Sequence, residues 1–222
     1  MADAEAPLKP RRHLPGDRLP DTRAMIRVDQ AGETGAARIY AGQLAVMGGR
    51  HAMAGEIRHM AHQEQRHLDG MNAVMARRGV RPTLFGPFWH VAGFALGAGT
   101  ALLGPKAAMA CTEAVETVID EHYGEQTEAL ADGSDPELKA MIDDYRADEV
   151  EHREAAAAHT GGGAFPVLES IIRAGCRTAI AVAKTAANSL AVRRSRGSLS
   201  MTEDMVRERG WRPQAIPGRR TG

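Results

Sequence analysis

Two copies of one short motif, a glutamate followed three residues later by a histidine, occur at matching places in the two halves of this chain. The two copies lie 85 residues apart, and each follows a lone glutamate by about thirty residues. The lone glutamates and their motifs are Glu33 with Glu64 and His67, and Glu116 with Glu149 and His152. Because residues i and i+3 share one face of a helix, each motif presents a carboxylate beside an imidazole. Four carboxylates and two imidazoles are the set with which a four-helix bundle binds a pair of iron or manganese ions.

Residues that favour turns lie midway between the glutamates of each set, where a helical hairpin would need its turn. Two residues of an antiparallel helical hairpin lie at the same level when they are equally distant from the turn. The first pair of glutamates, Glu33 and Glu64, is centred on a pair of glycines. The second pair, Glu116 and Glu149, is centred in the run Asp-Gly-Ser-Asp-Pro, which is typical of a turn. Each lone glutamate is therefore predicted to face its own motif across a hairpin.

A third motif of the same form, Glu56 with His59, fits this scheme less well. Its midpoint with Glu33 lies inside an uninterrupted helical stretch, so we interpret it as a solvated pair or as a neighbour of the ligands. A single motif of this kind in a charged helix is most often a solvated face. Two copies in register, each with its own glutamate and turn, rarely arise by chance, and they favour a dinuclear metal site.

The rest of the sequence predicts an all-α fold. Aromatic residues make up only 4% of the chain, and small residues are abundant, which suits closely packed helices. Helices are predicted at about 22–47, 52–78, 105–131, 136–159 and 166–190, the fourth opening with Asp135 as N-cap and Pro136 after it. Three regions are predicted: a disordered segment 1–21, a folded metal-binding domain 22–190, and a basic, disordered tail 191–222.

Residues 88–103 carry no formal charge and form an additional apolar helix in this prediction. Crossing a bilayer takes about 20 apolar residues, so this run is too short. Two interpretations remain open, a buried core helix and a helix lying in the membrane interface. In the second, the side chains dipping into lipid are Phe88, Trp89, Phe94, Leu96, Leu102 and Leu103, with Trp89 and His90 at the level of the headgroups.

Charge and cysteine usage exclude several other classes. The formal net charge is zero, and the folded part shows no basic face with interleaved aromatic residues, so nucleic acid is not an expected partner. The tail 191–222 has a net charge of +5, which could add attraction to anionic lipid. Cys111 and Cys176 are expected to be small buried residues without a disulfide. The N-terminus lacks the apolar stretch of a secretory signal.

Iron fits a site of carboxylates and imidazoles without thiolate. In the predicted centre, Glu33 and Glu116 each bind one ion, Glu64 and Glu149 bridge the two ions, and His67 and His152 bind one ion each. A ligating histidine usually donates its other N–H to a nearby acceptor, for which the helical positions leave three candidates open, Asp120, Asp144 and Asp148. Three tyrosines also share the metal-facing sides, each interpreted as core packing more readily than as a redox participant: Tyr40, Tyr123 and Tyr145.

Seven short stretches carry a further signal, in this order along residues 23–185: Arg27–Glu33, Ala37–Gln43, Gln63-Glu64 with His67, Ala110–Thr112 with Val115-Glu116, His122-Tyr123, Asp148-Glu149 with Glu151-His152, and Ile171–Arg177. Together they resemble the signatures of the demethoxyubiquinone hydroxylase family. The tail beyond about residue 190 lies outside the resemblance, and Glu121 departs from it.

The resemblance implies a ferritin-like four-helix bundle with an extra apolar interfacial helix and a C-terminal helix. It also implies a di-iron monooxygenase of ubiquinone biosynthesis that uses O2 to hydroxylate the ring of a polyprenylated demethoxyquinol. The family's ligands fall on the six residues selected above by spacing. The implied setting is peripheral association with membrane lipid on the cytoplasmic face of a bacterial-type cell membrane. A second copy of the chain or other ubiquinone-synthesis proteins are possible partners.

Other classes remain open. A ferritin-like ferroxidase or iron-binding protein would use the same ligands but does not need the apolar segment 88–103. A manganese catalase would share the metal-binding core and have polar surfaces throughout. A membrane-associated helical scaffold without metal is the non-catalytic alternative.

Overall fold

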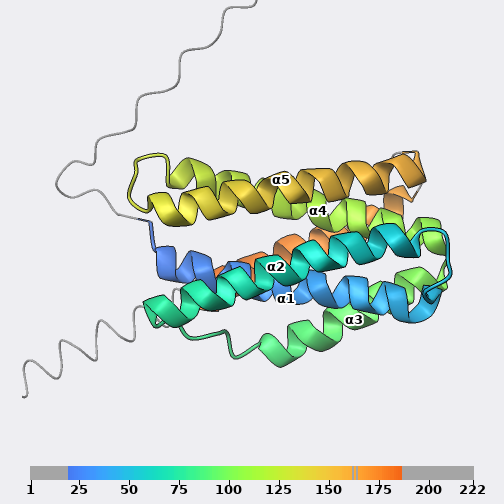
Figure 1. Ribbon diagram of the computed structural model, residues 1–222, viewed down its shortest axis with the longest axis horizontal. Helices are drawn as coiled ribbons and strands as arrows, with labels where there is room; N and C mark the ends of the chain where they lie inside the picture. Colours follow the sequence, from blue (N-terminus) through green and yellow to red (C-terminus); the bar gives the residue numbers. More distant parts are fainter. Residues whose placement is uncertain (1–19, 162, 164, 187–222) are drawn as a thin grey trace, which may run out of the picture.

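The computed structural model describes residues 20–161, 163 and 165–186, and every regular element within them is helical (Figure 1). The labelled helices are α1 Thr22–Met47, α2 Ala54–Arg78, α3 Gly86–Leu102, α4 Pro105–Ala129 and α5 Pro136–Thr160, and residues 166–186 are also helical. The predicted all-α class is confirmed, and the predicted boundaries of α1 to α5 agree to within about two residues. The tail 191–222, the end of the last predicted helix and most of segment 1–21 lie outside the described residues.

The ends of the helices follow from local chemistry. The side chain of Asp21 accepts a hydrogen bond from the backbone N–H of Ala24 at the start of α1, and Asp135 does the same for Leu138 at the start of α5. Gly48 ends α1 with a φ of 71°, a left-handed value that few other residues adopt without strain. The turns predicted from the midpoints of the glutamate pairs are therefore present.

Two helical hairpins form the bundle. One consists of α1 and α2 and the other of α4 and α5, and these four helices run along a common axis in Figure 1. The segment 166–186 packs against α1, α3 and α4 through Ile172, which lies in a cluster with Ile39 and Cys111. Both cysteines are free, as predicted, although Cys176 is only partly buried.

Helix α3 lies against the outer side of α1 in unusually close contact. A side chain on Gly97 would collide with the backbone carbonyl of Ile39, and one on Gly93 would collide with that of Gly35. Gly42 on α1 meets the backbone of α3 in the same way. The glycines of the apolar segment therefore let two helix backbones approach each other, which larger residues would prevent.

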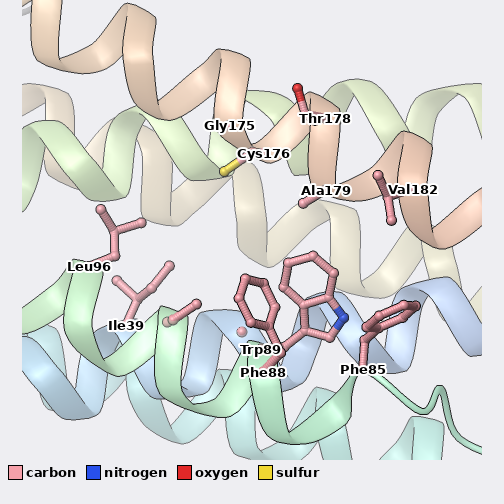
Figure 2. Close-up of a pocket in the computed structure, with 13 residues that line it drawn as sticks. Ile39, Phe85, Phe88, Trp89, Leu96, Gly175, Cys176, Thr178, Ala179 and Val182 are labelled. Carbon is pink, nitrogen blue, oxygen red and sulfur yellow. The ribbon is translucent and has the colours of Figure 1, made fainter.

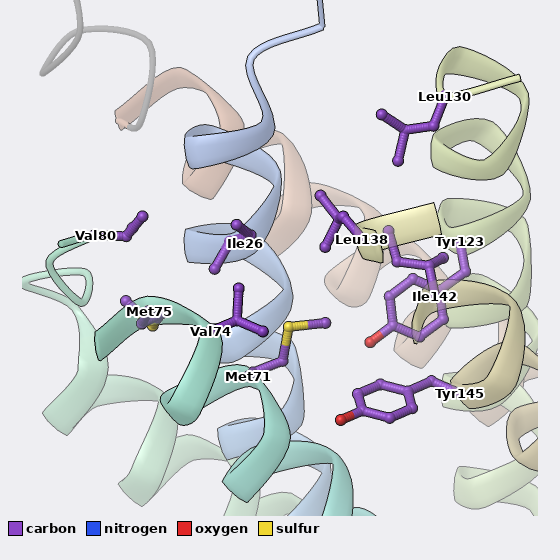
Figure 3. Close-up of a cluster of buried hydrophobic side chains, with 10 residues drawn as sticks. All are labelled: Ile26, Met71, Val74, Met75, Val80, Tyr123, Leu130, Leu138, Ile142 and Tyr145. Carbon is purple, nitrogen blue, oxygen red and sulfur yellow. The ribbon is translucent and has the colours of Figure 1, made fainter. Parts of the chain in front are cut away.

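The apolar core is divided into clusters on either side of a polar centre. One cluster lies toward the C-terminal ends of α2 and α4 and includes Ile26, Met71 and Ile142 (Figure 3). Tyr123 and Tyr145 belong to this cluster and extend from α4 and α5 toward the first hairpin. A second cluster, toward the other end, contains Tyr40, Met60 and Met109. The residues between them are thus shielded from water at both ends.

The outer face of α3 is exposed and apolar. The side chains of Phe88, Val91 and Leu102 are 59%, 67% and 75% exposed. Two residues expected in lipid lie elsewhere: Phe94 is half-buried under the guanidinium of Arg38, and Leu96 packs against the cluster of Ile39. Within the described residues, no helix has the length and apolar character needed to cross a membrane.

Candidate metal centre

All six predicted ligand residues lie together inside the bundle. Glu64, His67 and Glu149 are completely buried, and the remaining three expose at most 3% of their surface. Charged residues are almost never buried to this degree unless they are paired or bind metal. The two hairpins contribute equally, since each supplies one lone glutamate and one motif.

The six residues form two overlapping groups. In each, one possible ligand atom per residue lies within 4.8 Å of the others. The members are Glu33, Glu64, His67 and Glu149 in the first group, and Glu64, Glu116, Glu149 and His152 in the second. Only Glu64 and Glu149 belong to both. This arrangement suits two adjacent cations with Glu64 and Glu149 between them.

Both imidazoles present the same nitrogen to the carboxylates. His67 Nδ1 lies 3.3 Å from Glu149 Oε1 and 3.5 Å from Glu33 Oε2. His152 Nδ1 lies 3.3 Å from Glu64 Oε1 and 3.4 Å from Glu149 Oε2. The Nδ1 atoms are thus the nitrogens available to metal, and the Nε2 atoms point away.

Hydrogen bonding leaves the centre unsatisfied. Each of the six residues has at least one buried nitrogen or oxygen atom without a hydrogen-bond partner among the described residues, and Glu64 and Glu149 have two each. Leaving one such atom unpaired costs about 1–3 kcal/mol, and more when the group is charged. Carboxylate oxygens and imidazole nitrogens are donors that iron and manganese accept. The residues present therefore fit a pair of such ions.

The electrostatics give the same indication. Burial raises the pKa of Glu64 well above its ordinary value, and the neighbouring carboxylates add to the shift. Burial likewise raises the pKa of Glu116 and of Glu149. Burial alone would lower the pKa of His67, but the carboxylates of Glu149 and Glu33 outweigh it and bring the pKa to about 10. Cations among these groups would favour the ionised carboxylates.

Two tyrosines bind the lone glutamates directly. Tyr40 Oη donates a hydrogen bond of 2.7 Å to Glu116 Oε1 on the opposite hairpin, and Tyr123 Oη donates one to Glu33 Oε1. Tyr145 has a different role, because its hydroxyl donates to the backbone carbonyl of His67 and its ring stacks on that imidazole at 4.0 Å. Tyr40 and Tyr123 therefore pack in the core, as predicted, and also bind two of the predicted ligand residues.

The Nε2 atoms of the two histidines have different partners. His67 Nε2 lies 2.8 Å from Asp148 Oδ2, and His152 Nε2 lies 3.1 Å from Gln63 Oε1. Of the three aspartates that the sequence left open, only Asp148 contacts a predicted ligand. Asp144 pairs with Arg66, and Asp120 pairs with two arginines of α5, Arg146 and Arg153.

A buried polar group beside the centre was not found from the sequence. His122 Nε2 lies 3.0 Å from Asp29 Oδ1, and Gln126 Nε2 donates to the same oxygen at 2.6 Å. Burial raises the pKa of Asp29, despite opposing effects from His122 and Gln126. The signal that could have found this group is its spacing, since Asp29 precedes Glu33 by one helical turn and His122 precedes Gln126 by the same interval.

The third motif lies outside the centre, as predicted. Glu56 pairs with His159, and His59, whose side chain is 63% exposed, lies 3.9 Å from Glu151. Both pairs join α2 to α5 near the surface.

An apolar cavity of about 540 Å³ lies between α1, α3 and the segment 166–186 (Figure 2). The rings of Phe85, Phe88 and Trp89 face the segment that carries Cys176 and Val182. Trp89 therefore lines a cavity, with its indole nitrogen buried, and does not stand free at a headgroup level as expected. Ile39 lines the same cavity and packs in one cluster with Val115, the chain neighbour of Glu116.

Comparison with known proteins gives one consistent family. The family described as ubiquinone biosynthesis protein COQ7 matches residues 20–183. A 3-demethoxyubiquinol 3-hydroxylase of Rhodospirillum rubrum is 55% identical, over 77% of this chain and 82% of the relative. The human mitochondrial NADPH-dependent 3-demethoxyubiquinone 3-hydroxylase is 50% identical, over 70% and 74%. The mitochondrial 5-demethoxyubiquinone hydroxylase of Saccharomyces cerevisiae is 43% identical, over 70% and 74%.

Proposed function

The chain belongs to the COQ7 family of ubiquinone biosynthesis proteins. From this family and from the metal centre we propose its function. It is a 3-demethoxyubiquinol 3-hydroxylase, an oxidoreductase of the monooxygenase type that acts in ubiquinone biosynthesis. The observation that carries this conclusion, beside the family, is the set of four carboxylates and two imidazoles buried between the hairpins with unsatisfied atoms facing one another.

The cofactor in this proposal is a pair of iron ions. One ion would be held by Glu33 and His67 and the other by Glu116 and His152, with Glu64 and Glu149 shared between them. Bound iron supplies the activation of O2 that ring hydroxylation requires. Iron is favoured over manganese because the relatives named above are hydroxylases, not catalases.

The protein's own residues keep water out of the metal centre and orient the carboxylates that would bind the ions. The apolar clusters on either side of the centre exclude water, which strengthens the electrostatic interactions inside it. Tyr123 donates a hydrogen bond to one oxygen of Glu33, and Tyr40 donates one to one oxygen of Glu116, which fixes the rotation of each carboxylate. These contacts leave the remaining oxygens directed at the metal positions.

The substrate in this proposal is a demethoxyquinol with a polyprenyl chain. The cavity of Figure 2 is apolar and opens beside the exposed residues of α3, which suits an isoprenoid chain. Ile39 stands between this cavity and the neighbourhood of Glu116. We expect the ring to reach the metal centre past Ile39, with the chain remaining in the cavity.

The exposed apolar side chains of α3 support peripheral association with a membrane, which we propose to be on the cytoplasmic face of the cell membrane. Leu84, just before α3, and Phe88 and Leu102 on α3 are large apolar residues with exposed fractions of 88%, 59% and 75%, which suits contact with lipid. Lipid is the proposed partner of this surface. A second copy of the chain or another protein of ubiquinone synthesis would compete for it.

Two measurements test the function. A strain lacking this chain should accumulate the demethoxyquinone precursor, and the reduced, iron-loaded protein should transfer labelled oxygen from O2 into a short-chain demethoxyquinol. Label entering from water would contradict the monooxygenase assignment. Iron oxidation without any quinol product would instead identify a ferroxidase, which uses the same ligands but has no need of the apolar cavity.

A further inference from the structure

The two halves of the metal centre are related by an approximate twofold symmetry. Tyr40 and Tyr123 each stand seven residues beyond a lone glutamate, and each binds the lone glutamate of the opposite hairpin. The acceptors of the two histidine Nε2 atoms follow the same rule. Asp148 stands directly before Glu149 and contacts His67, while Gln63 stands directly before Glu64 and contacts His152.

Asp148 and Gln63 occupy equivalent places, but they differ in charge. The acceptor for His67 is a carboxylate at 2.8 Å, and the acceptor for His152 is a neutral amide oxygen at 3.1 Å. We infer that Asp148 and Gln63 are positioning residues that make the two metal positions unequal, the position of His67 binding its ion more tightly than that of His152. This inference rests on the proposed metal centre.

The physical cause is the charge of the acceptor. An imidazole that donates its N–H to a carboxylate gains electron density at the opposite nitrogen, so it becomes a stronger metal ligand. A hydrogen bond to an ionised acceptor is also shorter and about twice as strong as one between neutral groups, which holds the ring orientation more firmly. Gln63 fixes the tautomer of His152, because its oxygen accepts the Nε2 proton, but it adds no charge.

Arg66 does not cancel this difference. Its guanidinium binds Asp148 Oδ2 and, at 3.1 Å, Asp144 Oδ2, so its charge is shared between two carboxylates. Its side chain is 52% exposed, whereas that of Asp148 is 16% exposed and that of His67 is fully buried. Water therefore screens the arginine more than the aspartate–histidine contact. The main effect of Arg66 is to fix the carboxylate beneath the imidazole.

The test is an anaerobic titration of the metal-free, full-length protein with Fe²⁺, and separately with Co²⁺ followed by its absorption, in competition with a chelator. We expect two binding steps of different affinity, with His67→Ala removing the tighter one. Asp148→Asn should weaken the tighter step by about 10- to 100-fold and leave the weaker step unchanged. Circular dichroism of each metal-free variant checks that it is folded.

Two further variants make the result specific. Asp144→Asn removes the other partner of Arg66 without touching His67, so both steps should remain as in the unmodified protein. Gln63→Glu gives His152 a carboxylate, so the weaker step should strengthen toward the tighter one. This gain keeps the inference testable if Asp148→Asn fails to fold.

Each contrary outcome has a distinct meaning. Two equal steps in the unmodified protein, equal weakening of both steps by Asp148→Asn, or no gain from Gln63→Glu would overturn the inference while leaving the proposed function intact. Failure of the unmodified protein to bind either ion would overturn the proposed metal centre itself.

Discussion

Tyr40 on α1 touches both helices of the opposite hairpin at the metal centre. Its hydroxyl donates to Glu116 on α4 at 2.7 Å, and its ring stands edge-on to that of His152 on α5, with 6.0 Å between centroids. Burial raises the pKa of Tyr40 well above its ordinary value, and the charges of Glu116 and Glu64 add to the shift. The hydroxyl therefore keeps its proton and remains a donor at neutral pH.

Tyr40→Phe should weaken metal binding without abolishing it. The change removes the partner of Glu116 Oε1 while keeping the ring that packs in the core. We expect two iron ions per chain and an affinity reduced by about 10-fold, measured by chelator competition. Tyr145→Phe is the matched control, because that hydroxyl donates to a backbone carbonyl and not to a carboxylate. An equal loss in both variants would contradict the proposed role.

Glu64→Ala and Glu149→Ala should each remove both iron ions, because each residue belongs to both ligand groups. Iron analysis after anaerobic reconstitution gives the count per chain. The double variant Glu56→Ala with His59→Ala carries the same kinds of substitution in the outlying motif and should retain its iron. Full loading of Glu64→Ala, together with loss of iron from the double variant, would show that the wrong motif was chosen.

Gly97→Ala should destabilise the protein by about 1–3 kcal/mol, because the new methyl group would collide with the backbone of Ile39 and force α3 away from α1. Gly99→Ala in the same helix is the control, since no atom lies within 4 Å of its added Cβ. Greater helix propensity should leave that variant unchanged or more stable by up to about 1 kcal/mol. Urea denaturation of the metal-free proteins measures both, and equal stabilities would refute the close-packing argument.

Asp135 should make stability depend on pH in the acid range. The hydrogen bond from the guanidinium of Arg78 holds the pKa of Asp135 below its ordinary value of 3.8. A depressed pKa in the folded state stabilises the protein above the unfolded pKa, and this contribution is lost as the pH falls through the folded value. Asp135→Ala should therefore cost about 1–2 kcal/mol at neutral pH, including the helix cap, and less once the pH falls through the lowered pKa of the folded state. Thermal melts across pH 2–7 would show the two curves converging, and a constant gap would contradict the linkage.

Leu102→Glu should reduce binding to anionic lipid vesicles without loss of helicity. Its side chain is 75% exposed on α3, so a charge there costs the fold little but opposes insertion into lipid. Val46→Glu places the same charge on α1, at a side chain that is 37% exposed, and should bind as the unmodified protein does. Vesicle flotation with circular dichroism measures both properties. If the unmodified protein did not float with the vesicles, peripheral association would be refuted.

Sequence reasoning reached the helices and the six candidate ligands because both depend on local rules. Asp135 and Gly48 set helix ends through their own hydrogen bonding and backbone conformation, and the i, i+3 spacing places Glu64 beside His67 whatever the rest of the fold does. The turn at the midpoint of each glutamate pair then sets the two helices of a hairpin level with each other. None of these inferences needed the rotation of one helix against another.

The remaining details depend on that rotation and on packing. Asp120, Asp144 and Asp148 share similar helical positions, and only the stagger of α2 against α5 brings Asp148 to His67. Trp89 turns into a cavity because the segment 166–186 lies opposite it, which no pattern within α3 reveals. The contact of Asp29 with His122 joins α1 to α4 across 93 residues of sequence.

The division of ligands between the hairpins also sets an order for biosynthesis. Three residues of the first ligand group come from the hairpin of α1 and α2, and the fourth is Glu149 on α5. Three residues of the second group come from the hairpin of α4 and α5, and the fourth is Glu64 on α2. During synthesis the N-terminal hairpin leaves the ribosome first. The carboxylates of Glu33 and Glu64, which are buried in the folded protein, are then still uncovered. No complete metal position exists until α5 has been translated and has docked. Metal capture by the proposed centre would thus follow docking, and a nascent chain that stalls before α5 would leave the carboxylates of its first hairpin without their partners.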